Sequence, residues 1–153
     1  MATAPAFAGA HTQLLVEGSR LMVAYSFHRQ FHDDVESGRK LQTVRANRKR
    51  HARPGEALQL YGGMRTRHCR KLVDPDPICS DVQLIQIAVL TDVHQRLGFI
   101  TIDGITLDDD EIEAFAIADG FHATTLATAR QRMGRFWSIH HGAGLFDGVV
   151  IRW

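Results

Sequence analysis

The segment Val82-Gln83-Leu84-Ile85-Gln86-Ile87-Ala88-Val89-Leu90 carries the strongest strand signal in this chain. Val, Ile and Leu dominate it, and this composition over a short length is typical of a buried strand. Shorter strand signals precede and follow it, at 21–25, 41–45, 58–61, 64–73, 99–102 and 146–153. Because Gly62-Gly63 joins two of these segments, we expect 58–61 and 64–73 to form a hairpin. The sequence therefore predicts about six strands, largely antiparallel.

The first expected helix lies between the strands at 21–25 and 41–45. Phe27, Phe31 and Val35 recur at a four-residue spacing, which places apolar side chains on one face of a helix. Gly38 follows and is suited to end the helix as a left-handed cap. These residues predict about two to three helical turns immediately before the next strand.

The second expected helix begins in the acidic segment 107–113, because carboxylates in a first turn complement the positive end of the helix dipole. Its apolar stripe consists of Ile112, Phe115 and Ala116, and the same period places Asp119 next on that stripe. A carboxylate on a buried stripe and at the negative end of a helix breaks two local rules, which happens most often at functional sites. The alternative is an Asp-Gly turn with Gly120.

The third expected helix covers about 125–140, with Leu126, Ala129 and Met133 facing inward, and it ends before Gly142. Three helices grouped between about six strands predict an α+β fold. The expected arrangement is a small closed or nearly closed β-barrel with helices covering one side.

Length and composition are those of one ordinary globular domain. The 153 residues are 44% hydrophobic and 23% charged, which indicates a single domain over 21–153 with a frayed N-terminal extension at 1–20. The extension lacks the basic start and long apolar run of a signal peptide. No apolar segment approaches the roughly 20 residues of a membrane helix. We therefore expect a cytoplasmic protein that does not span a membrane.

Charge is unevenly distributed along the chain. Residues 39–71 contain eleven Lys and Arg residues and one acid, Glu56, which gives this segment a charge of +10 in a chain of net charge +1. Such asymmetry predicts an anionic partner, phosphate above all, on one side of the molecule. Within the segment, Lys40, Thr43 and Arg45 place an amine, a hydroxyl and a guanidinium close together after the helix stop at Gly38. Period-two alternation puts Thr43 and Arg45 on one face of a strand.

Several of these segments resemble the ASCH domain, a family related to the RNA-binding PUA domains. The resemblance is carried by 31–40 (FHDDVESGRK), by Thr43-Val44-Arg45, by the Pro54–Leu58 turn and strand, and by Ala118-Asp119-Gly120-Phe121. It covers most of the chain, from about Met22 to the C-terminus. It implies a PUA-like β-barrel and a cleft for RNA or a nucleobase. Leu41 stands where the family commonly has threonine.

The resemblance also implies a chemistry. Bacterial N(4)-acetylcytidine amidohydrolases of this family use a lysine, a threonine and a glutamate, which correspond here to Lys40, Thr43 and, with one methylene less, Asp119. We therefore expect metal-independent hydrolysis of N(4)-acylated cytosine nucleosides, with these three groups converging in space. Other family members are reported as ribonucleases. A non-catalytic RNA-binding module and a ribonuclease are therefore the alternative functions.

The role of each group stays open at this point. Lys40 is either a base, if its pKa falls well below about 10.4, or a cation that stabilises an oxyanion, and its alternative is a solvated lysine after a helix cap. Thr43 is either the nucleophile or the group that positions a water, and its alternative is a residue chosen for β-propensity.

Further residues are expected to bind the substrate. The expected ligands of the nucleoside are Arg39, Arg45, Tyr61 and Phe121, with core packing as the alternative for Phe121 and Trp137. The expected phosphate or RNA ligands are Arg48, Lys49, Arg50 and Arg53. The nine histidines include the pair His140-His141 and several single residues, and no metal site and no cofactor are expected. The expected partner is a modified nucleoside or RNA.

Overall fold

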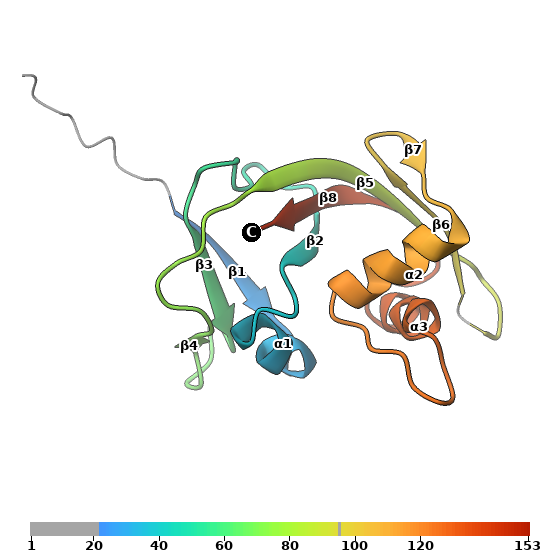
Figure 1. Ribbon diagram of the computed structural model, residues 1–153, viewed down its shortest axis with the longest axis horizontal. Coiled ribbons are helices and arrows are strands. Elements are labelled where there is room, and N and C mark those ends of the chain that lie inside the picture. Colours follow the sequence, from blue (N-terminus) through green and yellow to red (C-terminus); the bar gives the residue numbers. More distant parts are fainter. Residues whose placement is uncertain (1–21, 95) are drawn as a thin grey trace, which may run out of the picture.

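The computed structural model describes residues 22–94 and 96–153 (Figure 1). The expected N-terminal extension, 1–20, and Leu21 lie outside the described residues. Within them, eight strands form two sheets, accompanied by three α-helices and one 3-10 turn. The predicted α+β class is therefore confirmed. Six of these described strands have five residues or more, in keeping with the expected number, and two have only two residues.

The larger sheet is built on the segment that was predicted to be the strongest strand. It contains β2 (Gln42–Ala46), β5 (Asp81–Val89), β6 (Leu97–Ile102), β7 (Ile105–Thr106) and β8 (Gly144–Arg152), in the order β2-β8-β5-β6-β7. All its pairs are antiparallel, and β5 pairs with β8 along its entire length. Ile85, Ile87 and Val89 alternate into the core, as period-two side-chain placement requires. Figure 1 shows β5 and β8 curving over the molecule towards α2 and α3.

The smaller sheet contains β1 (Val23–Phe27), β3 (Leu58–Gly62) and β4 (Arg70–Lys71), with β1 parallel to β3. The expected hairpin return over 64–73 is wrong except at its two-residue β4. The Thr66 hydroxyl donates to the Gly63 carbonyl and accepts from the His68 amide, so local turns replace the ladder in this segment. Gly63 and Arg65 have positive φ angles of 66° and 65°, which a strand does not allow.

The first helix is shorter than expected. Phe27 ends β1, a 3-10 turn covers Arg29–Phe31, and α1 covers only His32–Glu36. The four-residue spacing of Phe27 and Phe31 was therefore misleading, because Phe27 also completes the alternation of buried residues with Val23 and Tyr25. The left-handed cap at Gly38 is confirmed by its φ of 76°.

The two longer helices lie together under one end of the larger sheet (Figure 1). α2 covers Asp109–Ala118, as the acidic segment predicted, and Asp108 forms a capping box with Glu111. α3 covers Ala129–His141 and begins later than expected, because Thr128 forms a capping box with Gln131 and so ends the preceding loop. Within the described ranges, the helices are all too short or too polar to cross a membrane.

Candidate functional site

Lys40 and Asp119 form a buried ion pair. The Lys40 Nζ lies 3.1 Å from the Asp119 Oδ1 and also donates to the backbone carbonyl oxygen of Asp119. The two residues are only 2% and 5% exposed. The alternative of a solvated lysine is therefore wrong, and two groups distant in sequence meet as the resemblance implied.

Helix geometry explains how Asp119 is held. It is the C-cap of α2, and the amides of Gly120 and Phe121 donate to the carbonyls of Ile117 and Ala116, which is the Schellman pattern of a helix end. Lys40 supplies the positive charge that the negative end of the helix favours. The carboxylate that looked misplaced in the sequence is therefore compensated by one buried amine.

Gly120 is required at this turn for two reasons. Its φ is 97°, a left-handed conformation that L side chains rarely adopt. A Cβ at this position would lie 2.9 Å from Phe31 Cδ1 and 3.0 Å from Lys40 Cδ. Only glycine therefore lets the end of α2 approach the Lys40 side chain this closely.

Burial shifts the pKa values of both partners towards their neutral forms. Burial lowers the pKa of Lys40; Asp119 and Asp34 oppose the shift, and Arg45 adds to it. Burial raises the pKa of Asp119, and Lys40, Gln42 and Arg45 oppose it. Because its pKa is lowered, Lys40 gives up its proton at a smaller free-energy cost than an exposed lysine would.

Thr43 and Arg45 lie beside each other on β2, as period-two alternation predicted. The Arg45 Nε donates to the Thr43 Oγ1 over 3.0 Å, and the Arg45 Nη2 donates to the Ser26 carbonyl over 2.7 Å. The guanidinium also stacks over the Tyr25 and Phe27 rings. Burial lowers the pKa of Arg45 to about 10. Arg45 is therefore a fixed cation that touches the Thr43 oxygen.

These groups line one cavity of about 260 Å³. Its polar lining includes Lys40, Thr43, Arg45 and Asp119, and Phe121 forms part of its wall. The other lining residues are Ser26, Phe27, His28, Phe31, Val44, Ala46, Phe136, Trp137 and His141. The cavity is thus an aromatic pocket whose lining residues carry one amine, one carboxylate, one guanidinium, two hydroxyls and two imidazoles, a combination typical of a binding or catalytic site.

The aromatic wall is a packed cluster. Phe121 packs edge-on against Phe31, with ring centroids 5.3 Å apart, and both rings lie 5.4 Å from Phe136. Phe31 also lies under the Lys40 ammonium, whose Nζ is 4.8 Å from the ring centroid. Phe121 therefore serves the core and the cavity wall together, so the two roles weighed for it from the sequence are not exclusive.

A second polar contact joins the segments that carry the pair. Asp34 of α1 is buried and accepts hydrogen bonds from Arg39 Nε over 2.8 Å and from His122 Nε2 over 2.6 Å. The Lys40 amide also donates to the Asp34 carbonyl. Because His122 follows shortly after Asp119, this contact holds the end of α2 against the turn that presents Lys40.

Three histidines near the cavity were not singled out in the sequence. His28 and His141 line the cavity, and His140 lies between His28 and Phe136 with centroid distances of 4.7 and 4.2 Å. Burial, followed by the neighbouring His140, lowers the pKa of both His28 and His141. The i,i+4 spacing of Phe136 with His140 and of Trp137 with His141 on α3 was the available signal.

Other expected ligands lie outside the cavity. The Arg39 side chain is 60% exposed and bound to Asp34. Tyr61 lies on β3 opposite Lys71 and is not part of the cavity lining. The basic loop, 46–53, lines the cavity only through Ala46. In that loop the Arg48 guanidinium stacks over Tyr25, and the Arg50 guanidinium binds Glu56.

The strong positive charge of segment 39–71 is also partly neutralised. Besides Arg39 and Arg50, Arg70 binds Glu36 and Lys71 binds Asp76. Most of these carboxylates come from outside the segment, which a count along the sequence cannot show. Among residues 22–94 and 96–153, no three His, Cys, Asp or Glu side chains gather in a group that could hold a metal ion.

The chain was also compared with known proteins. No family model, no curated protein and no solved structure matches it.

Proposed function

We propose that this protein hydrolyses N(4)-acylated cytosine nucleosides of the N(4)-acetylcytidine type, and that it is a divergent relative of the ASCH domain with a PUA-like arrangement of its two sheets. The observation that supports this most is the buried Lys40–Asp119 pair, which shares one cavity with Thr43. From the resemblance we expected these three groups to meet, although Asp119 lies far from Lys40 and Thr43 along the chain.

Cavity size and wall chemistry favour a single base as the ligand. The cavity volume of about 260 Å³ lies near the lower end of small-molecule sites, which span about 300–1,000 Å³. Phe31, Phe121 and Phe136 supply apolar ring surface against which a flat base can pack. A lining of this size and character suits one nucleobase and its modification better than several stacked bases.

The side chains supply each part of an acyl transfer. The Thr43 Oγ1 attacks the acyl carbon, its proton passes to Lys40, and Lys40 returns a proton to the departing N(4) as the C–N bond breaks. A water then attacks the threonine ester, releases the carboxylic acid and restores the hydroxyl. The hydrogen bond from Arg45 Nε stabilises negative charge on the Thr43 oxygen. Lys40 Nζ donates to the backbone carbonyl oxygen and to the Oδ1 of Asp119. These two hydrogen bonds leave one further site on the neutral amine nitrogen, which can accept the proton of Thr43.

A pure RNA-binding module explains the site less well. In that alternative, Lys40 is a phosphate contact, and such contacts are made by accessible cations. Here Lys40 is only 2% exposed and already bound to a carboxylate. A buried acid in this position weakens phosphate binding, but it suits a proton-transfer site.

Cytidine release from N(4)-acetylcytidine, followed by chromatography, tests the proposal. Wild-type protein and the Thr43→Ser variant should form cytidine, because both keep a hydroxyl on β2, whereas Thr43→Val should lose about 10²–10⁴ of the rate. Lys49→Met serves as the matched control for Lys40→Met, since Lys49 is exposed. Cytidine formation by Lys40→Met at the wild-type rate, or no product from the wild type, would remove the proposal.

A further inference from the structure

We propose that the substrate base enters as part of a single-stranded polynucleotide, whose backbone lies in two cationic grooves on either side of the cavity. The identity of the base rests on the proposed function, whereas the two grooves rest on lining residues outside the proposed catalytic set. The first, the α3 groove, has a volume of about 760 Å³ and shares Phe121 and Phe136 with the cavity. The second, the β4 groove, has a volume of about 600 Å³ and shares Phe27 with it.

The α3 groove carries arginines on one face of its helix. Arg132 and Arg135 lie one turn apart on α3, and Ile139 follows on the same face. Arg132 gives one N–H to the His122 carbonyl, and its guanidinium has further donors for a ligand. Leu126 and Ile139 are 94% and 61% exposed beside these cations. Alternating guanidinium and apolar surface suits a chain of alternating phosphates and bases.

The β4 groove has the same character on the other side. Its lining consists of Phe27, Arg29, His32, Gly63, His68 and Arg70. Arg70 is bound to Glu36, so Arg29 is the arginine that this groove offers to a ligand. Phe27 separates the groove from the cavity and packs edge-on against Trp153. The cavity and the groove that contains Arg29 therefore adjoin the same ring.

Charge in the two grooves has one sign. Among their described lining residues there are five arginines and four histidines and no Asp or Glu. One arginine of each groove is bound to a carboxylate outside the lining, Arg96 to Asp92 and Arg70 to Glu36. The proposal therefore rests on Arg29, Arg132 and Arg135. A surface of this kind attracts an extended anion.

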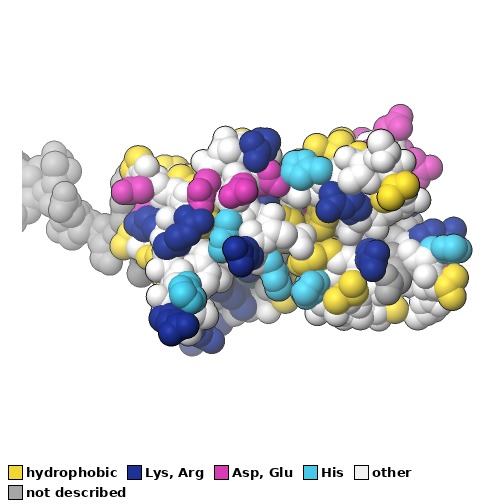
Figure 2. All heavy atoms as spheres, turned by 90° about the horizontal axis from the view of Figure 1, so that it is seen from below, with side chains coloured by type: hydrophobic (Ala, Val, Ile, Leu, Met, Phe, Trp, Pro, Cys, Tyr) yellow, Lys and Arg dark blue, Asp and Glu magenta, His cyan; other side chains and the backbone are white. Residues whose placement is uncertain are grey.

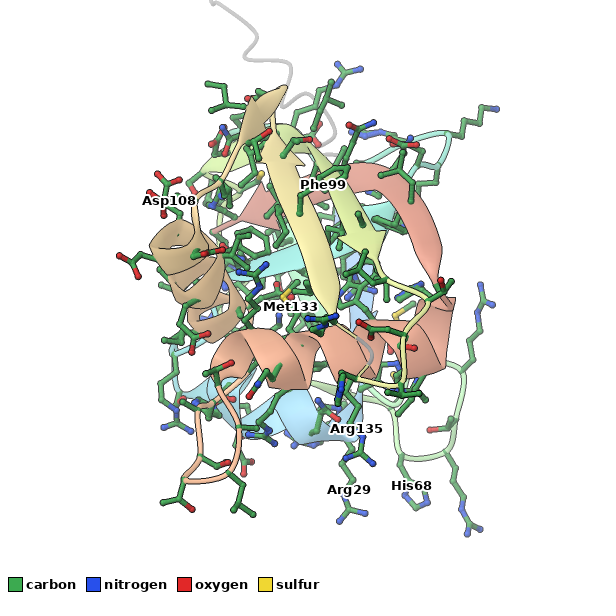
Figure 3. The ribbon with its side chains drawn as sticks, turned by 90° about the vertical axis from the view of Figure 1, so that its right-hand side faces the viewer. Arg29, His68, Phe99, Asp108, Met133 and Arg135 are labelled. Carbon is green, nitrogen blue, oxygen red and sulfur yellow. The ribbon has the colours of Figure 1, made fainter. Side chains whose placement is uncertain are left out.

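Arg29 and Arg135, one from each groove, lie on one face of the molecule (Figure 3). In Figure 3, Arg29, His68 and Arg135 all project from the lower side. Figure 2, which views the molecule from below, shows His, Lys and Arg side chains distributed over that face, with a group of Asp and Glu side chains near one edge of it. A mononucleotide carries its phosphate on one side of the base only, whereas a strand with residues before and after the bound base carries phosphates on both sides.

Fluorescence anisotropy of a labelled, unmodified single-stranded RNA of about nine nucleotides tests the grooves without any need for catalysis. The test variant is Arg29→Gln/Arg135→Gln, which removes one exposed cation from each groove. The matched control is Arg65→Gln/Arg67→Gln, which removes two exposed cations that belong to neither groove lining. The variants remove equal charge, so a difference between them reports position.

The expected effect follows from counterion release. On a single strand each phosphate contact adds about 0.7 to the slope of log affinity against log salt, so each contact contributes about threefold in affinity at about 200 mM salt relative to 1 M. At that salt the test variant should therefore bind about tenfold more weakly, and its salt slope should be lower by about 1.4. The control should bind within about twofold of the wild type. A second measurement uses RNA with the modified cytidine at one end and the single variants Arg29→Gln and Arg135→Gln. With the modified cytidine at the 5′ end, only one of the two variants should weaken binding. With it at the 3′ end, only the other should.

Each outcome has a defined meaning. Equal weakening by the test and control variants, or competition by a polyglutamate peptide as strong as that by RNA, would overturn the proposal. So would hydrolysis of free N(4)-acetylcytidine by a protein that binds no RNA, although the proposed function would then stand. RNA binding with the expected variant pattern but without any hydrolysis would support the grooves and contradict the amidohydrolase.

Discussion

Lys40 and the basic loop 46–53 lie on either side of β2 in the sequence, but their charged groups differ in exposure to water. Lys40 is buried against Asp119 in an aromatic cavity. Arg48, Lys49 and Arg53 are exposed to water, where one charge more or less changes little. The comparison teaches that one buried cation carries more information about function than a run of exposed ones.

The largest expected effect comes from breaking the buried pair. Lys40→Met should destabilise the protein by about 3–5 kcal/mol, because it leaves Asp119 buried without its counter-charge. Lys49→Met should leave the midpoint of chemical unfolding unchanged within error. Urea unfolding followed by circular dichroism measures both. A similar midpoint for the two variants would mean that the Lys40–Asp119 contact does not exist in solution.

The close packing beside the Lys40–Asp119 pair can be tested by replacing two glycines of similar backbone conformation, one beside the pair and one in open space. Gly120→Ala and Gly55→Ala should each cost about 1–2 kcal/mol for a left-handed alanine, since φ is 97° and 90° respectively. Gly120→Ala should cost about 1–3 kcal/mol more, because its Cβ meets Phe31 and Lys40, whereas nothing lies within 4 Å at Gly55. Urea unfolding of the two variants gives the difference. Equal losses would contradict the close approach at Gly120.

A smaller effect is expected for the contact that joins α1 to the end of α2. Burial raises the pKa of Asp34, but hydrogen bonds from Arg39 and His122 outweigh it and leave this pKa below its ordinary value. The folded state therefore binds the proton less tightly than the unfolded state, so this carboxylate stabilises the fold above about pH 3.9. That stabilisation is lost as the pH falls through the folded-state pKa.

Asp34→Asn should remove this pH dependence and cost about 1.5–3 kcal/mol near neutral pH. Unfolding curves at a series of pH values between about 3 and 7 measure the effect. The variant should lose less stability than the wild type on acidification. Parallel curves for the two proteins would show that Asp34 is not held by Arg39 and His122.

The smallest expected effect is a shift in the pH dependence of the catalytic rate. Because burial lowers the pKa of Lys40, kcat/KM for N(4)-acetylcytidine should rise with pH to a plateau, with an apparent pKa below about 10.4. Thr43→Ser should keep this profile at a lower plateau, since the amine is unchanged. A rate that falls with pH over this range would assign Lys40 to an oxyanion-stabilising role instead.

The sequence predicted the parts of the fold and site that depend on local patterns. The strands around Val82–Leu90, the α+β class and the helix start at 107–113 follow from composition, periodicity and charge near a helix end. Asp119 was identified because a carboxylate on a buried stripe is locally unfavourable. Its stabilisation by Lys40 depends on a tertiary contact, which periodicity alone does not encode.

The parts that were missed depend on competition between elements or on distant partners. Phe27 satisfied the helical and the strand period together, and the strand prevailed. The return strand at 64–73 failed because the Thr66 hydroxyl closes local turns. Arg29 and Arg135, which carry the proposed grooves, lie far apart along the chain and on one face of the folded molecule (Figure 3), so spacing in the sequence could not join them.

Cytidine release by a folded variant without the buried pair tests the central claim most directly. Lys40→Met/Asp119→Leu replaces both charges by apolar groups, which removes the unpaired charge and should restore stability relative to Lys40→Met alone. We expect this variant to unfold at a urea concentration close to that of the wild type and to release no cytidine from N(4)-acetylcytidine, while the wild type does. Cytidine release at the wild-type rate by the folded double variant would contradict the account.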